Sequence, residues 1–219
     1  MFTADHDEIR KAIHRAQHCQ RNWDLTQEIP KEDLDLFIES VTQCPSKQNI
    51  AHYRVHAITN RSLIEQVHHL TDGFTYNLRA GSKETQTNTQ VLANLLLVFE
   101  GLPTESKLEK NRNTAVTALV EDINNVSADK VMSADAHQAV GVAAGFVNVV
   151  ASLLGYGTGC CACFDDIRVQ RLMKLENAPV LLMGIGFKQE GVNRRVHHKN
   201  PDFVFPTMPK QDIEVVYYN

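Results

Sequence analysis

The stretch from Ala136 to Phe164 constrains the fold most, because none of its 29 residues is Asp, Glu, Lys or Arg. Its first part, residues 138–154, is rich in Gly, Ala and Val, and this composition predicts a helix. A helix of a water-soluble protein stays uncharged on all sides only when it is buried nearly all round. We therefore expect a central helix whose small residues let neighbouring elements approach closely.

The same stretch is long enough to cross a membrane, but its composition argues against this. His137, Gln138, Asn148 and Ser152 fall within it, and many of its other residues are Gly or Ala. The N-terminal residues are acidic and lack the basic and then apolar layout of a signal peptide. The five cysteines, an odd number, are scattered except for Cys160, Cys161 and Cys163, and they fit a reducing compartment better than a disulfide framework. These features predict a cytoplasmic protein that neither enters nor binds a membrane.

Size and charge are those of an ordinary globular protein. The chain has 219 residues, 43% of them hydrophobic, and its formal net charge is -4. This charge gives no electrostatic reason to expect binding to nucleic acid. No repeat, low-complexity tract or linker divides the chain, so residues 1–219 are expected to form a single domain.

Hydrophobic periodicity predicts an α+β fold. Helices are expected over residues 7–18, after Pro30, from Asn60 to Leu70, over 104–125, and after Asp165. Strands are expected over 53–59, 91–99 and 180–187. Residues 71–90 are expected to be polar and irregular, 189–209 to be basic and extended, and Ile213–Tyr218 to be strand-like.

The glycine-rich segment Gly155–Gly159 allows two interpretations. It follows a helix and has GxGxG spacing, whereas the dinucleotide-binding fingerprint follows a strand, so Rossmann-type binding is not expected. The simpler interpretation is a helix C-cap followed by a tight turn. Both hold if the turn also presents backbone amides to a planar ligand.

Cysteine and histidine pairs could indicate redox or metal chemistry. Cys160 and Cys163 have the CxxC spacing of a redox dithiol or of half a zinc site, but a second pair is missing. His52 and His56 lie in a segment that alternates like a strand, which would place them about 13 Å apart, too far for one ion. His68–His69 and His197–His198 are expected to be surface pairs. No metal site is predicted.

Three segments together resemble the nitroreductase family of FMN-dependent oxidoreductases. Gln17–Trp23 is similar to the family's Arg-Arg-Ser-x-Arg-x-Phe, and Cys44–Val55 is similar to its Ala-Pro-Ser-x-x-Asn-x-Gln-Pro-Trp-Arg-Phe. The third match combines Leu154–Gly159, Cys163–Asp165 and Pro179–Phe187. In order and spacing the resemblance spans most of the chain, and it is weakest over residues 71–132.

The resemblance implies a nitroreductase-like FMN-binding fold. In this fold a mixed or antiparallel central sheet is flanked by helices, and two chains form an intertwined homodimer with FMN at the subunit interface. The uncharged helix would then pack against its partner. Residues 203–219 would form an extension that packs on the other subunit.

The resemblance also implies which residues hold FMN. Arg21 would lie near the pyrimidine edge of the flavin, where a cation stabilises the charge gained on reduction. Basic Arg194 and Arg195, which follow a buried strand, would bind the phosphate. Residues bordering the ring would be His18, Cys19, Asn77, Cys160, Cys161, Ala162 and Cys163, together with Pro45, Ser46 and Asn49 of the other subunit.

Departures from the family pattern bear on how tightly FMN is held. Gln17 stands where relatives place a phosphate-binding Arg, a loss for which Arg15 or His18 could compensate. Cys19 replaces a Ser, and Cys163 replaces a Gly at a point where backbone approaches the ring.

The function implied is transfer of a hydride from NAD(P)H through FMN to a nitroaromatic, quinone or similar small acceptor, by a ping-pong mechanism. No side chain is expected to act as a catalytic acid or base, because the flavin carries the chemistry. Two alternatives stay open at this point. One is an FMN-binding relative without reductase activity, which stores or cleaves flavin. The other is a thiol-redox or metal protein that uses Cys160 and Cys163.

Overall fold

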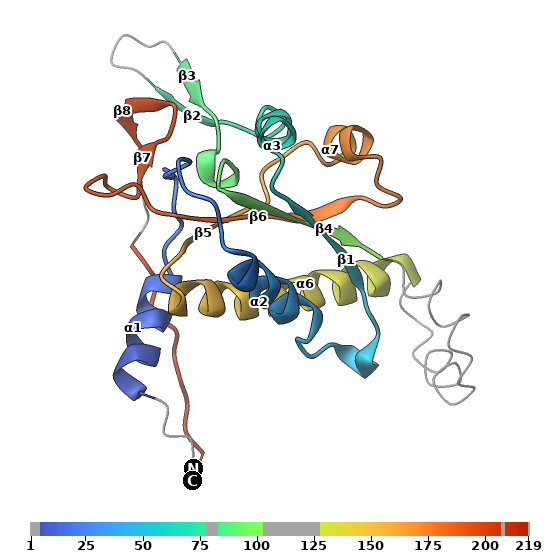
Figure 1. Cartoon of the computed structure of the whole chain (residues 1–219). Helices are drawn as coiled ribbons and strands as arrows, with labels where there is room; N and C mark the ends of the chain where they lie inside the picture. Colours follow the sequence, from blue (N-terminus) through green and yellow to red (C-terminus); the bar gives the residue numbers. More distant parts are fainter. Residues whose placement is uncertain (1–4, 78–82, 103–127, 207–208, 219) are drawn as a thin grey trace.

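The computed structural model describes residues 5–77, 83–102, 128–206 and 209–218 (Figure 1). At its centre lies an antiparallel sheet of order β1-β4-β6-β5, formed by Tyr53–Ile58, Leu95–Gly101, Pro179–Gly186 and Gly157–Cys161. Two hairpins stand apart from it: β2 with β3 (Phe74–Asn77, Lys83–Gln86) and β7 with β8 (Val196–His197, Asn200–Val204). The helices are α1 (His6–Ala16), α2 (Lys31–Thr42), α3 (Arg61–His68), α6 (Ala128–Leu153) and α7 (Asp166–Met173), with short 3-10 helices η1 (Lys47–Asn49) and η2 (Thr89–Val91). The helix expected over 104–125 lies outside the described residues.

Several helices begin at the residues that the sequence indicates. The side chain of Asn60 accepts a hydrogen bond from the backbone of Leu63 and caps α3. Asp165 does the same for α7, and Asp5 caps α1. These caps satisfy backbone N–H groups that the first helical turn leaves without a partner.

Helices cover both faces of the sheet, which explains the unbroken apolar run in β4 (Figure 1). Leu95, Leu97 and Phe99 of β4 pack on one side, in a core cluster that includes Phe37 of α2 and Val147 of α6. The intervening β4 residues pack on the other side against α3, α7 and η2; they are Leu96 and Val98. The expected α+β fold with a helix-flanked sheet is therefore confirmed.

The predicted central helix is α6, and α1 docks on its C-terminal half through polar side chains. Asn148 Nδ2 donates to the carbonyl oxygen of Ala16, and Ser152 Oγ donates to that of Ala12, each at 2.9 Å. Polar residues in the uncharged stretch thus satisfy the end of a neighbouring helix. By length and composition alone Ala134–Leu153 could cross a membrane, but in this fold one face of the segment forms part of the core.

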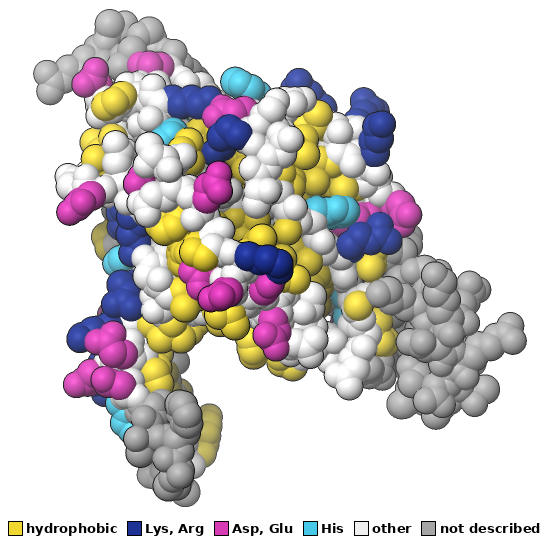
Figure 2. Space-filling view, viewed as in Figure 1, with side chains coloured by type: hydrophobic (Ala, Val, Ile, Leu, Met, Phe, Trp, Pro, Cys, Tyr) yellow, Lys and Arg dark blue, Asp and Glu magenta, His cyan; other side chains and the backbone are white. Residues whose placement is uncertain are grey.

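The other face of α6 is exposed and apolar within the single chain, so this chain alone does not bury the helix all round. Phe146 is 47% exposed, and Val142 and Leu153 are exposed beside it. Gly141 and Gly145 interrupt this face, and a Cβ built on either of them meets nothing within 4 Å. A backbone of another element could therefore approach this stripe closely. Elsewhere, on the side drawn in Figure 2, acidic and basic side chains are intermixed.

The glycine-rich segment after α6 differs from the predicted turn. Gly155 has a φ of 89° and ends the helix, as expected for a C-cap. Gly157–Cys161, however, is the edge strand β5, paired with β6. Backbone packing explains the difference, since a Cβ at Gly159 would lie 2.5 Å from the Cβ of Gln90. The glycines of β5 therefore leave space for neighbouring segments such as η2, and they do not form a turn.

Other expectations also need correction. Residues 71–90 were expected to be irregular, but they contain the β2–β3 hairpin, where the hydroxyls of Thr75 and Thr85 pair across the strands. The strand expected over 91–99 begins only at Leu95, because Asn94 turns away to bond the carbonyl oxygens of Asp24 and Gln27. Residues 209–218 form no strand, and Ile213 and Tyr218 are exposed.

Replacing Gly184 with alanine tests the close approach of η2 to the sheet. A Cβ at this position of β6 would lie 2.1 Å from the carbonyl oxygen of Gln90, so η2 must move. We expect Gly184→Ala to lower the free energy of unfolding by about 3 kcal/mol in urea denaturation. Gly101→Ala is the matched control, because its Cβ meets a movable Val180 methyl at 3.0 Å, and we expect less than about 1.5 kcal/mol. Equal losses in the two variants would contradict this packing.

Candidate functional site

Three segments distant in sequence meet at the outer edge of β5, the edge that does not pair with β6. Cys19 forms a parallel bridge with Thr158, and the backbone N–H of Gln20 donates to the carbonyl oxygen of Thr158 at 2.7 Å. The backbone N–H of Arg21 donates to the carbonyl oxygen of Arg194 at 3.0 Å. Because of these bonds, residues 18–21, β5 and the loop around Arg194 form one continuous surface.

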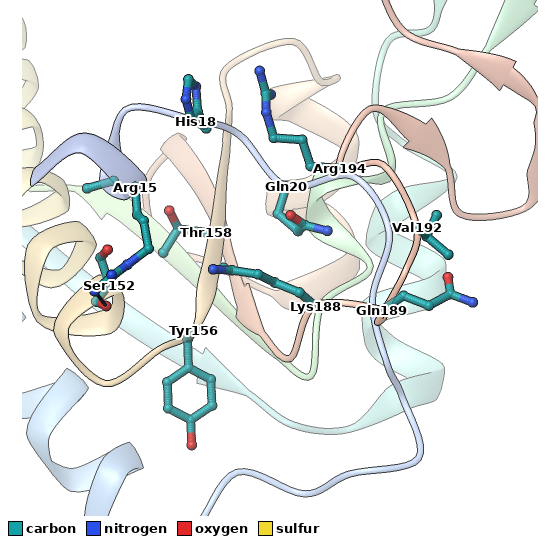
Figure 3. A pocket seen from close by; sticks show the side chains of 12 residues that line it. Arg15, His18, Gln20, Ser152, Tyr156, Thr158, Lys188, Gln189, Val192 and Arg194 are labelled. Atoms are coloured by element: carbon teal, nitrogen blue, oxygen red, sulfur yellow. Dashed lines mark hydrogen bonds between the residues drawn. The ribbon is translucent and has the colours of Figure 1, made fainter. Parts of the chain in front are cut away.

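A pocket of about 260 Å³ opens on this surface, and its lining is basic (Figure 3). Arg15, His18, Lys188 and Arg194 contribute side chains to it, and none of the described residues that line it is acidic. Two of the cations are fixed by backbone: Arg15 donates to the carbonyl oxygen of Ser152 and Arg194 to that of Cys19, each at 3.1 Å. In a chain of net charge -4, such a pocket is suited to an anion.

Burial and neighbouring cations lower the pKa values of two groups in this pocket. Burial, together with the charge of Arg15, lowers the pKa of Lys188. Burial, and then the charges of Arg194 and Lys210, lower the pKa of His18. A bound phosphate would supply the opposite charge that the pocket lacks and would oppose both shifts.

Next to the pocket lies Arg21, which is half-buried. Its Nη1 donates to Oε1 of Gln90 at 2.5 Å, and its guanidinium lies 4.0 Å from the ring centroid of Phe205. Burial is the main cause that lowers the pKa of Arg21. At the end of β5, Ala162 and Cys163 are exposed beside this group of residues.

The thiols of β5 are protonated at neutral pH. Burial is the first cause that raises their pKa values, to about 12 for Cys160 and about 11 for Cys161. Thiolates are the reactive form, so these environments disfavour a thiol nucleophile. Among the described residues, no group of three or more His, Cys, Asp or Glu side chains is placed to hold a metal ion.

The structure brings together many of the residues expected to bind FMN. His18, Cys19, Arg21 and Arg194 meet along β5, next to the segment Cys160–Cys163. Arg195 does not line the basic pocket; its carbonyl oxygen accepts the backbone N–H of Phe205. Asn77 ends β2, and the surroundings of its side chain lie outside what is described.

A second group of expected residues lies elsewhere in the chain. Ser46 and Asn49 line a cavity of about 490 Å³ with Tyr53, and Pro45 is exposed beside them. Lys47 holds this loop to α6 through an ion pair with Asp135 at 2.9 Å. None of these residues contributes to the basic pocket of the same chain.

Two residues of this group, Lys188 and Gln90, were not predicted from the sequence. Lys188 follows the end of β6, at the same end of the sheet as Gly155, and that position was a usable signal. Gln90 gives no such signal, because it reaches Arg21 only through the packing of η2 on Gly159.

Each adjacent histidine pair was expected to lie on the surface, but one member of each pair is buried, while His69 is exposed. His68 and His197 are buried, and their Nε2 atoms both contact Oγ1 of Thr87, at 2.9 and 3.2 Å. Burial is the main cause that lowers the pKa of His68 to about 3. His197 Nδ1 accepts the backbone N–H of Lys199, so its Nε2 carries the proton and donates to Thr87.

Comparison with known proteins identifies the family. The model of the nitroreductase family matches residues 15–187, so the chain belongs to this family. Comparison with curated protein sequences gives no significant match.

Solved structures share the fold at low sequence identity. A candidate NAD(P)H:FMN oxidoreductase of Staphylococcus epidermidis is 21% identical with a TM-score of 0.65, over 88% of this chain and 92% of that one. A candidate nitroreductase of Exiguobacterium sibiricum, solved in complex with FMN, is 19% identical with a TM-score of 0.64, over 96% and 95%. A nitroreductase family protein of Streptococcus pneumoniae is 16% identical with a TM-score of 0.63, over 94% and 100%.

Substitution of the two adjacent arginines tests which one faces the anion. We expect Arg194→Gln to weaken binding of FMN roughly tenfold or more, because a charged hydrogen-bond donor is lost from the pocket. Arg195→Gln is the matched control and should change binding little. Isothermal titration with FMN, and with riboflavin as its phosphate-free counterpart, measures the effect. If the larger loss fell on Arg195, or if riboflavin were affected as strongly as FMN, this pocket would not be the anion site.

Proposed function

We propose that this chain is an FMN-dependent oxidoreductase that uses NAD(P)H. The observation that carries the proposal is the pocket of Arg15, Lys188 and Arg194, which has no acidic residue among its described lining residues and adjoins a further fixed cation, Arg21. A phosphate and a flavin ring need cations at two separate places. Membership of the nitroreductase family, and the FMN bound in the Exiguobacterium neighbour, support FMN as the ligand.

The residues present fit this cofactor. Arg15, Lys188 and Arg194 would hold the phosphate, with His18 at the same pocket. Arg21 would offset the negative charge that collects at the pyrimidine edge upon reduction. At the end of β5, Ala162 and Cys163 are exposed, and this segment would lie against the ring. In this arrangement the side chains bind and orient, and none needs to transfer a proton.

The chemistry that FMN supplies when bound is two-electron transfer, here from NAD(P)H to a nitroaromatic, quinone or similar acceptor. We propose that donor and acceptor occupy the same opening in turn, which is a ping-pong mechanism. NAD(P)H as the donor is supported by the name of the Staphylococcus neighbour. Free thiols fit the proposed cytoplasmic location.

We also propose that the working form is a homodimer. The exposed stripe of α6 around Val142 and Phe146 is suited to a second copy of the same helix, because Gly141 and Gly145 permit close approach. A partner would bring Ser46 and Asn49 to the site, to which they do not belong within one chain. The exposed apolar residues of the segment 203–219 would then pack on the other subunit; they include Ile213, Val215 and Tyr217.

Two other functions remain as candidates. A flavin-binding relative without reductase activity would have the same pocket and differ only in its response to NAD(P)H. A thiol protein that uses Cys160 and Cys163 is disfavoured, because burial raises the pKa of the Cys160 thiol.

A visible absorption spectrum tests the proposed activity. We expect FMN added to the purified protein to be bound, and its absorption band to bleach when NADPH or NADH is added without oxygen. Addition of menadione or a nitroaromatic compound should restore the band. A bound band that neither nucleotide bleaches would favour the flavin protein without reductase activity. Failure to bind FMN in excess would exclude both flavin functions.

Light scattering after size exclusion tests the dimer. Wild type is expected at twice the chain mass, and Phe146→Arg at the mass of one chain, because a charge on the α6 stripe cannot be buried in the interface. The matched control is Ile167→Arg, a change on α7 at a side chain that is 54% exposed, and it should stay dimeric. A wild-type monomer that binds FMN would contradict the proposed dimer.

A further inference from the structure

Arg21 is held from several directions although it is not in an ion pair within the described residues. Its backbone carbonyl oxygen accepts a hydrogen bond from Thr89 Oγ1 at 2.7 Å, and its backbone N–H bonds to Arg194. Its guanidinium meets Gln90 at the edge and Phe205 at the face. A long, flexible side chain is thus restricted without its charge being neutralised.

Phe205 provides a rigid platform for the guanidinium. Its side chain is buried, its backbone N–H donates to the carbonyl oxygen of Arg195 at 2.9 Å, and its ring stacks on His197 with 5.6 Å between centroids and 21° between planes. The Thr87 hydroxyl and the Lys199 backbone in turn fix His197. Arg21 therefore lies over a ring that has little freedom to move.

Gln90 holds the edge of the Arg21 guanidinium through a hydrogen bond. Its Nε2 donates to the carbonyl oxygen of Cys160 at 3.1 Å, and this bond directs Oε1 toward Arg21. The same Gln90 packs against Gly159, so the amide is anchored to β5. Through Gln90, the position of Arg21 depends on the strand whose end adjoins the proposed flavin site.

A fixed cation stabilises the negative charge of a reduced redox group at a smaller entropic cost than a mobile cation does. A guanidinium that is already in place loses no rotamer freedom when negative charge develops beside it, whereas a free one does. Neutral partners hold the charge without cancelling it, unlike a carboxylate. A purely structural stack would instead serve only to attach the segment after β8 to the body of the protein.

We propose that Phe205 and Gln90 are positioning residues that hold the Arg21 guanidinium as a full positive charge for the reduced flavin. The inference rests on the proposed function, because it requires FMN to bind beside Arg21. It concerns preference for the reduced over the oxidised cofactor, and not the binding of phosphate.

The test is the midpoint potential of protein-bound FMN, measured together with its dissociation constant. We expect Phe205→Leu to reduce the preference for reduced over oxidised FMN roughly three- to tenfold, in line with loss of a cation–π contact. A tenfold loss corresponds to a midpoint lowered by about 30 mV for a two-electron couple. Gln90→Leu should lower the potential in the same direction, and it serves if Phe205→Leu does not fold.

Phe203→Leu is the matched control. The ring of Phe203 packs at 4.9 Å from that of Phe205 and also contacts His197, so the change disturbs the same aromatic cluster. Its potential should stay at the wild-type value. Phe205→Tyr keeps the aromatic face and should restore the potential that Phe205→Leu loses.

The outcomes separate this inference from the proposed function. A lowered potential in Phe205→Leu with an unchanged one in Phe203→Leu supports the positioning role. Equal potentials in the wild type and both variants, with FMN bound in each, would overturn that role and leave the flavoprotein function standing. If the wild type binds no FMN, the proposed function and the inference fail together.

Discussion

The close approach of backbone to the glycines of β5 and β6 is the constraint on which the site depends. At Gly159 and Gly184 there is no space for a Cβ, because η2 lies directly against the sheet. This contact places Gln90 beside Arg21, while residues 18–21 pair along the outer edge of β5. A side chain at either glycine would separate these segments and so separate the cations that they carry.

Electrostatics follows from this packing. Arg15, Lys188 and Arg194 come from three different segments and are brought to one pocket without an acidic neighbour among its described lining residues. Burial, and then the charge of Arg15, lower the pKa of Lys188 in this pocket. The opposite solution occurs at Glu100, a buried carboxylate that His56, Arg54 and Asn177 satisfy. Burial alone would raise the pKa of Glu100, but the bond from His56, then those from Asn177 and the charge of Arg54, lower it. The charge of Glu100 is therefore satisfied within the chain, whereas the basic pocket is suited to an external anion.

Much of the fold was predictable from local sequence, and the parts that were not depend on contacts between distant segments. The caps at Asn60 and Asp165 and the apolar run in β4 are local signals, and they placed α3, α7 and a central strand correctly. The glycines before Cys160 resembled a turn because a sequence does not show what packs against them. His68 and His197 resembled surface residues because their shared partner, Thr87, is distant in sequence from His197.

The same limit applies to the site. The resemblance assigned Arg21, Arg194 and Arg195 alike to FMN. In the structure the backbone of Arg21 bonds to that of Arg194 beside β5, and Arg194 lines the basic pocket, whereas Arg195 does not. Lys188 and Gln90 belong to no motif, and only the folded chain brings them to the site. The residues Pro45, Ser46 and Asn49 do not line the basic pocket of the same chain.

A crystal structure of the protein grown with FMN would be the most direct test of the proposed cofactor site. We expect the phosphate between Arg15, Lys188 and Arg194, with the flavin ring next to an Arg21 that still lies on Phe205. A phosphate bound elsewhere, or a ring distant from Arg21, would contradict it.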